Sequence, residues 1–211
     1  MSQGPIVQAS HLRVVVDAYR ASGADPRPDA ERLGIDVRAA DDPEAYVYEW
    51  PVWHFFEAGR HRIRSDFGFF AYDQSQVAAL GDFGRRIAAP TLMDVLSRFF
   101  DGLRQASTVA DFRLEVDGLR VRFVRAGPRL GSPDWAVEQY VIAMIIGICR
   151  SALGGDWLPE RVWLQYAGPL DEAEASWLDG IDVDFASAVT ALEVPRRLLH
   201  RPAGRSGVTS D

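Results

Sequence analysis

The chain of 211 residues contains no lysine and no asparagine, and all 23 of its basic residues are arginine. Both missing residues have AT-rich codons, which indicates a bacterial genome of high GC content. The single cysteine, Cys149, excludes an intramolecular disulfide and any multi-cysteine metal site. Among the four histidines, His54 and His61 would share one helix face at about 10 Å, too far apart to ligate one metal. We therefore expect neither a metal nor another cofactor.

Long hydrophobic runs and targeting signals are also missing. The longest apolar stretch, Tyr140 to Cys149, is broken by Gly147 and is far shorter than the roughly 18 residues that span a bilayer. Residues 1–5 lack the charged and apolar regions of a signal peptide. A cytoplasmic location without membrane binding is therefore expected. A net charge of −7 and a pI of about 5.1 argue against nucleic-acid binding by this chain itself.

The composition that remains is typical of a globular protein, with 47% hydrophobic and 25% charged residues. Apolar residues recur at helical spacing in several segments, and Gly, Pro or an N-capping residue bounds most of them. The predicted helices cover residues 10–22, 30–33, 51–63, 74–87, 92–103, 134–153 and 171–178.

Strands are predicted mainly in the second half of the chain. Two runs of alternating apolar and charged residues flank Asp117-Gly118, which is a strong hairpin signal. Further short strands are expected over residues 162–166, 181–185 and 189–194. Helices interspersed with hairpin-type strands indicate an α+β fold. We expect an antiparallel sheet containing hairpin 112–124, packed against helices 92–103 and 134–153. Residues 6–201 would form one domain, and residues 202–211 a linker or disordered tail.

Catalytic signatures are missing from the sequence. Neither G-x-S-x-G nor a phosphate-binding loop occurs, and Cys149 lies in the apolar middle of a predicted helix, where a thiol is inert. Arg60, Arg62 and Arg64 could clamp an anion, but cations at the end of a helix also complement its dipole, and we favour that interpretation. An enzyme would need converging titratable groups, so we expect no catalytic residue and keep a small-molecule enzyme as a second alternative only.

Aromatic residues are concentrated between Trp50 and Tyr72. Core packing explains most of them, but the cluster also favours an apolar ligand pocket with a few polar groups. In such a pocket Arg85 would bind a carboxylate or phosphate. The expected ligand contacts are Trp53, Phe69, Phe70, Tyr72, Arg85, Trp163 and Tyr166.

Four motifs occur in an order that is typical of one protein family. They are Ser22-Gly23-Ala24-Asp25-Pro26 with Leu33-Gly34-Ile35, then Ser65-Asp66-Phe67-Gly68-Phe69, then Leu80-Gly81-Asp82-Phe83-Gly84 leading to Ala89-Pro90-Thr91-Leu92, and finally Ile181-Asp182-Val183-Asp184-Phe185 with Leu198-Leu199-His200-Arg201-Pro202. From about Ile6 to Pro202 the chain resembles the N-terminal, arabinose-binding-like regulatory domain of AraC-type bacterial transcription regulators. Phe69 stands where the family has Leu and Val95 where it has Ala, which would remodel a pocket.

The resemblance implies a domain that senses a small-molecule effector and forms a homodimer. Family members continue into a DNA-binding domain with two helix-turn-helix motifs, so DNA would be bound only through a C-terminal domain absent from this chain. The linker-like end at Asp211 favours a truncated chain. The alternative function is a pure dimerisation or interaction module without effector. The alternative fold is the cupin-like jelly roll of the founding arabinose regulator, which the many predicted helices disfavour.

Overall fold

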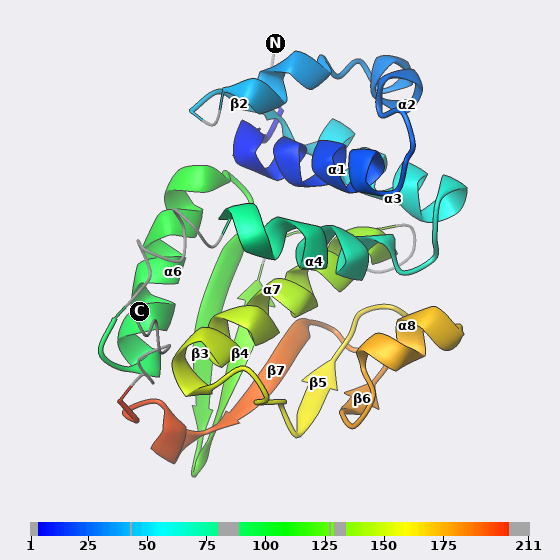
Figure 1. Cartoon of the computed structure of the whole chain (residues 1–211). Coiled ribbons are helices and arrows are strands. Elements are labelled where there is room, and N and C mark those ends of the chain that lie inside the picture. The colour runs from blue at the N-terminus through cyan, green and yellow to red at the C-terminus, as the bar shows by residue number, and fades with distance from the viewer. Residues whose placement is uncertain (1–3, 43, 80–88, 127, 129–133, 203–211) are drawn as a thin grey trace, which may run out of the picture.

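The computed structural model describes residues 4–42, 44–79, 89–126, 128 and 134–202. It confirms the α+β class and arranges the chain in three layers (Figure 1). The N-terminal helices form one outer layer and a five-stranded sheet forms the other. Helices α4 (Phe67–Ala79) and α7 (Trp135–Leu153) lie between these layers, where α4 contacts α1 and α7 contacts the sheet.

The N-terminal layer begins with a short antiparallel pair that the sequence did not predict, β1 (Ile6–Gln8) and β2 (Tyr46–Tyr48). The predicted first helix is confirmed, because its apolar stripe is buried against the layer below. Gly23 follows that helix with φ +82°, a conformation that glycine adopts without strain. The helices of this layer are α1 (Ala9–Ala21), α2 (Arg27–Arg32), the 3-10 helix Val37–Asp41 and α3 (Glu49–Arg62).

In the middle layer, the predicted start of one helix is wrong. Helix α4 begins at Phe67 rather than near Gln74. Phe67 and Phe69 are fully buried, and they pack against Tyr19 of α1 and Trp135 of α7, which favours an earlier start of the helix. Residues 80–87 of the predicted helix lie outside the described part of the chain. A Cβ on Gly68 would lie 2.0 Å from the carbonyl oxygen of Ala136, so the backbones of α4 and α7 approach each other closely.

Helix α7 is the core of the molecule. It is long and apolar enough to cross a membrane by composition alone, yet most of its side chains are buried within this fold. The burial of nearly every face matches the apolar pattern of residues 134–153, and the helix ends before Gly154 at φ +119°. A Cβ on Gly147 would lie 1.6 Å from the Tyr72 hydroxyl oxygen, which again shows close packing against α4.

The sheet has the order β3-β4-β7-β5-β6. The predicted hairpin is confirmed as β3 (Asp111–Asp117) and β4 (Arg120–Ala126), with Gly118 at φ +56° in the turn. The other strands are β5 (Arg161–Trp163), β6 (Asp182–Asp184) and β7 (Thr190–Pro195).

One strand pair corrects the expectation of an antiparallel sheet. Strands β5 and β6 are parallel, because the segment between them carries α8 (Glu172–Trp177) and brings the chain back to the same end of the sheet. The sheet is therefore mixed. The jelly-roll alternative is wrong, since one mixed sheet with helices packed on it replaces the two facing sheets of a jelly roll.

Helix α6 (Leu92–Ala106) lies against β3 and α7 as expected, and Thr91 caps it by accepting a hydrogen bond from the Asp94 N–H at 3.2 Å. Both ends of α6 contact distant segments. The Met93 N–H donates to the carbonyl oxygen of Leu199 at 2.9 Å, just after the 3-10 helix Arg196–Leu198. At the other end Ser107 pairs with Val7 of β1. Helix α6 thus connects the C-terminal segment to the N-terminal layer.

Candidate functional site

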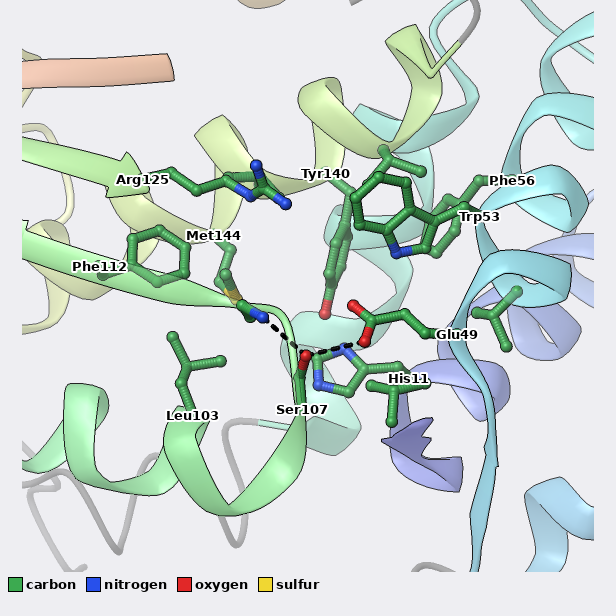
Figure 2. A pocket seen from close by; sticks show the side chains of 15 residues that line it. His11, Glu49, Trp53, Phe56, Leu103, Ser107, Phe112, Arg125, Tyr140 and Met144 are labelled. Carbon is green, nitrogen blue, oxygen red and sulfur yellow. Dashed lines mark hydrogen bonds between the residues drawn. The ribbon is translucent and has the colours of Figure 1, made fainter. Parts of the chain in front are cut away.

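A mostly apolar cavity with a few polar side chains lies where the N-terminal layer meets α6, α7 and the hairpin. Its volume is about 60 Å³. Side chains from β1, α1, α3, α7 and β4 converge on it, together with the end of α6 and the segment that follows (Figure 2). The lining residues are Val7, His11, Glu49, Val52, Trp53, Phe56, Leu103, Ser107, Ala110, Phe112, Arg125, Val137, Tyr140, Val141 and Met144.

Glu49 supplies a buried carboxylate to this cavity. It is the first residue of α3 and only 4% exposed. The Ser107 hydroxyl donates to Glu49 Oε2 at 2.9 Å, and in turn accepts from the Ala110 N–H at 2.9 Å (Figure 2). Burial raises the pKa of Glu49, while hydrogen bonds from the side chains of Ser107 and Trp53 and the charge of Arg125 oppose that rise.

Arg125 supplies a buried guanidinium. It is 3% exposed on β4, donates from Nη1 to the carbonyl oxygen of Pro128 at 2.7 Å, and lies over the Trp53 ring with its Cζ 5.4 Å from the centroid. Burial lowers the pKa of Arg125 to about 10, and the charges of Glu49, Glu138 and Asp134 oppose the decrease. Arg125 therefore stays charged at neutral pH.

His11 and Tyr140 complete the polar lining. Their rings meet edge to face with centroids 6.4 Å apart. Burial lowers the pKa of His11 to about 4 and raises the pKa of Tyr140. Both side chains are therefore neutral near pH 7, so the formal charges that the described residues bring to the cavity wall are those of Glu49 and Arg125.

A second cluster of buried polar groups surrounds the first turns of α7, and we call Glu57, Glu138, Gln139 and Glu174 the polar hub. Glu138 is fully buried and accepts hydrogen bonds from Gln165 N (2.7 Å), Tyr166 N (2.9 Å) and Thr190 Oγ1 (2.5 Å). Burial raises the pKa of Glu138, and these three hydrogen bonds oppose the rise. Glu138 thereby joins α7 to the strands of the sheet.

The other members of the polar hub join α7 to its remaining neighbours. Glu57 accepts from the Ala136 N–H at 2.5 Å, and Gln139 accepts from the Gly68 N–H at 2.9 Å. Glu174 accepts from the Trp135 indole at 2.7 Å. The hub therefore connects α3, α4 and α8 to one end of the central helix.

The residues expected to contact a ligand do not all come together. Only Trp53 lines the cavity among those in the described part of the chain. Phe69 stacks on Trp177 with ring centroids 4.4 Å apart, and Tyr166 stacks on Trp135 at 4.2 Å. Tyr72 also meets Trp177, edge to face at 6.4 Å. These aromatic side chains form a packed cluster around α4, α7 and α8.

Three further expected contacts lie elsewhere. Phe70 lies under the Arg64 guanidinium, whose Cζ is 4.5 Å from the ring centroid. Trp163 lies on β5 beside Arg122, 5.5 Å from its Cζ. Arg85 lies outside the described residues.

The other residues that the sequence suggested for anion binding or catalysis have structural roles. Arg60, Arg62 and Arg64 pair with Glu57, Asp29 and Asp66 respectively. Cys149 is fully buried, and burial raises its pKa to about 12, so the thiol is unreactive at neutral pH. Within the described ranges no group of three His, Cys, Asp or Glu residues could hold a metal ion.

Sequence reasoning missed five polar residues of the cavity, His11, Glu49, Ser107, Arg125 and Tyr140. The sequence pattern of β4 does indicate one of them, Arg125. Val121, Phe123 and Arg125 fall on alternate positions of β4 and are all buried. A charged residue in the inward register of an amphipathic strand indicates a buried, and often functional, cation.

Comparison with known proteins agrees with this fold. Residues 23–203 match the family described as the arabinose-binding domain of AraC transcription regulator, N-term. The chain belongs to this family. The AraC-type domain is a transcription-regulator domain, and its family is not an enzyme family.

Among solved structures, the AraC-type domain is similar to the crystal structure of transcriptional regulator CdpR from Pseudomonas aeruginosa, with a TM-score of 0.58 at 16% identity. The match covers 89% of this chain and 58% of that one, so the chain spans less than two thirds of the length of CdpR. At 16% sequence identity, this similarity shows a shared fold alone. No curated protein matches the chain.

Proposed function

We propose that this domain senses a small-molecule effector in the cavity and forms a homodimer, as part of a cytoplasmic bacterial regulator that binds DNA through another domain. Residues 6–201 constitute the sensing unit, and residues 202–211 the linker. The effector prefers one arrangement of the domain or dimer, and that preference changes the population that binds DNA.

The observation that carries the proposal is a cavity with two buried, oppositely charged side chains. Burying a charge costs free energy unless it is paired, and across the described residues Glu49 and Arg125 form no ion pair with each other. Trp53, Tyr140 and Met144 add apolar surface beside them. A few polar groups converging in an apolar pocket are typical of ligand sites.

The experiment is a thermal-shift screen of the full chain against a metabolite library. An effector at 100 times its Kd adds about 2.7 kcal/mol of stability, which raises the Tm of a domain of this size by about 5–10 °C. Ala110→Phe fills the cavity and abolishes the shift, whereas Ala21→Phe, on the exposed end of α1, leaves it unchanged. A shift that survives Ala110→Phe would place the effector elsewhere.

Exposed apolar side chains support the dimerisation part of the proposal. Tyr46 and Tyr48 on β2 are 49% and 59% exposed, and Leu119 at the hairpin tip is 86% exposed. Such groups are frequent in protein interfaces. Sedimentation velocity over a range of concentrations measures the dimer, and the variants Tyr48→Arg and Leu119→Arg identify which surface forms it. A monomer at all concentrations contradicts dimerisation by this chain.

A pure dimerisation module remains the alternative, favoured by the small volume of the cavity. The two functions differ in the screen, since a module without effector dimerises equally well in the presence of every compound.

A further inference from the structure

Strand β3 forms one edge of the five-stranded sheet (Figure 1). It has seven residues, contains no proline, and pairs with β4 on one side without a bulge. A sheet edge presents backbone N–H and C=O groups with which a strand of another chain can pair, and short strands, prolines and bulges commonly protect against this. The β3 edge has none of these three protections.

The side chains of β3 alternate between the two faces of the sheet. Those of Phe112, Leu114 and Val116 lie on the face that α6 contacts, where Phe112 meets the ring of Phe99 with centroids 5.5 Å apart. Phe112 is 6% exposed and Leu114 is half-buried, but Val116 is 60% exposed. Helix α6 therefore covers the first part of this apolar row, and the last part can contact a partner.

The opposite face of β3 carries charges of both signs. Arg113 Nε donates to Glu115 Oε1 at 2.9 Å, and Arg122 Nη2 of β4 donates to Glu115 Oε2 at 2.8 Å. The two arginine side chains are more than 40% exposed. Exposed ion pairs of this kind contribute little to the stability of a fold, so their charges can also act on an approaching strand.

A second copy of β3 is complementary to this edge. In an antiparallel pair with its twofold axis at Leu114, Arg113 lies opposite the partner's Glu115, and the symmetry repeats this pair. On the other face Leu114 lies opposite the partner's Leu114, and Val116 lies opposite the partner's Phe112. Cross-strand pairs of opposite charge and of apolar side chains stabilise antiparallel sheets. The same pairing covers the exposed Val116.

The ends of the paired stretch bring carboxylates together, because Asp111 lies opposite the partner's Asp117. Within its own hairpin, Asp117 is also the register partner of Arg120. A guanidinium therefore lies beside each of these carboxylate pairs and reduces their repulsion.

Other registers and the other edge of the sheet fit less well. Moving the axis to Arg113 or to Glu115 sets that residue against its own copy, and like charges directly opposite each other are destabilising. The other edge is β6, with three residues, and its antiparallel self-pairing would set Asp182 against the partner's Asp184. The charge pattern thus selects β3 and its register.

We propose that a second copy of this chain binds the β3 edge, antiparallel and strand to strand, so that one continuous sheet spans the homodimer. This inference rests on the dimerisation in the proposed function and names the surface that forms it. Arg113 and Glu115 set the register, and Leu114 lies on the twofold axis.

Sedimentation velocity of charge variants tests the pairing. Arg113→Glu sets carboxylates against each other at both symmetry-related places, and Glu115→Arg does the same with guanidinium groups. We expect each variant alone to raise the Kd of the homodimer about tenfold or more, because two cross-strand pairs change at once. The matched controls, Arg38→Glu and Glu31→Arg, lie at exposed positions of the N-terminal layer and leave the Kd unchanged.

Mixing the two variants separates a lost contact from a damaged fold. In an equimolar mixture of Arg113→Glu and Glu115→Arg, each introduced charge faces an opposite one. We expect a heterodimer about as tight as the wild-type homodimer. A mixture that associates no better than either variant alone overturns the proposal.

Cysteine cross-linking determines the register. A residue on the twofold axis lies about 5 Å from its own copy, within the Cα distance of about 7 Å that a disulfide needs. Val116 would lie four residues away from its copy along the strand, which is about 13 Å. We expect Leu114→Cys to form disulfide-linked dimers under mild oxidation and Val116→Cys not to, as measured on a non-reducing gel. The native Cys149 is fully buried.

The outcomes separate this inference from the proposed function. A dimer that both charge variants leave intact, or that Tyr48→Arg alone weakens, has another interface, so dimerisation stands and the β3 pairing is wrong. A monomer at all concentrations contradicts both. If the charge variants do not fold, as judged by circular dichroism, the cysteine variants decide: no linked dimer from Leu114→Cys, or as much from Val116→Cys, overturns the pairing.

Discussion

The polar hub and the cavity are two buried polar clusters on the same helix, and they differ in how their groups are satisfied. In the hub, Glu138 accepts three hydrogen bonds from the protein within 2.9 Å. In the cavity, Glu49 and Arg125 face each other without contact, although both are at least 96% buried. A satisfied buried network rigidifies a fold, whereas a partly satisfied one is costly unless something else completes it.

This difference separates a structural cluster from a binding site. Polarity and burial alone would rank the hub first, because Glu138 and Glu174 are more deeply buried than Glu49. What distinguishes the cavity is empty volume beside two opposite charges that form no ion pair within the described residues. The same distinction predicts how substitutions at the two places affect stability.

The largest effect is expected in the hub. Glu138→Ala leaves the N–H groups of Gln165 and Tyr166 and the Thr190 hydroxyl buried without their acceptor, which destabilises the fold by about 3–5 kcal/mol. Urea unfolding followed by circular dichroism measures the loss. Glu172→Ala, at an exposed carboxylate of α8, changes the free energy of unfolding by less than about 0.5 kcal/mol. A loss below 1 kcal/mol for Glu138→Ala contradicts the structural role of the hub.

The next largest effect concerns the packed side of α7. Gly147→Ala places a methyl group against the Tyr72 hydroxyl and costs about 1–3 kcal/mol through overpacking. Gly155→Ala is the matched control, because a Cβ there meets no atom within 4 Å. Thermal unfolding of both variants gives the comparison. Equal melting temperatures would mean that α4 and α7 are less closely packed than described.

A pH-dependent effect is expected at the cavity. The pKa of His11 falls to about 4 in the fold, from about 6.5 in the unfolded chain. The unfolded chain therefore binds more protons, and the stability that His11 contributes is full above pH 6.5 and is lost as the pH falls towards 4. We expect the free energy of unfolding to decrease between pH 7 and pH 4.5 by about 2–3 kcal/mol less in His11→Gln than in the wild type. Urea unfolding at pH 7, 5.5 and 4.5 measures it.

Two other titrations must be separated from this one. The raised pKa of Glu49 acts in the opposite direction, since its contribution grows as the pH falls, and it is present in wild type and variant alike. His61→Gln, at an exposed histidine of α3 outside the cavity, is the matched control for the substitution itself. A His11→Gln profile that parallels the wild type would show that His11 is not desolvated.

The smallest effect tests the empty volume directly. Val141→Ile adds one methylene to the cavity wall and stabilises the fold by up to about 0.8 kcal/mol. Val15→Ile adds the same group to a fully buried position outside the cavity and destabilises it by about 1 kcal/mol or more. Thermal unfolding distinguishes the signs. Destabilisation by both variants would mean that the cavity wall is as tightly packed as the core.

Much of the fold could be predicted from local patterns. The apolar stripe of α6, its Thr91 cap and the hairpin around Gly118 are consequences of residues close in sequence. The short strands β1 and β2 were missed, and β5 and β6 were predicted as strands but not as a parallel pair, because such pairing depends on distant segments. Helix α4 began earlier than predicted, since tertiary packing of Phe67 and Phe69 outweighed the glycine between them.

The cavity could be predicted only in part. Trp53 was among the expected contacts, and Arg125 occupies an inward strand position that the alternation marks. Glu49 and Ser107 carry no such signal, because their meeting depends on how α3 packs against the end of α6, 58 residues away in sequence. The aromatic residues near Phe69 instead form part of the core, as aromatic density alone does not distinguish a packed cluster from a pocket.

Helix α6 connects two distant parts of the molecule. Its 15 residues span about 22 Å. One end carries Leu103 of the cavity wall, and the other holds Leu199 through the Met93 N–H. Because the helix is continuously hydrogen-bonded, a rigid shift of its cavity end would also displace the contact between Met93 and Leu199. Helix α6 therefore joins the wall of the cavity to the segment around Leu199 in one continuous element.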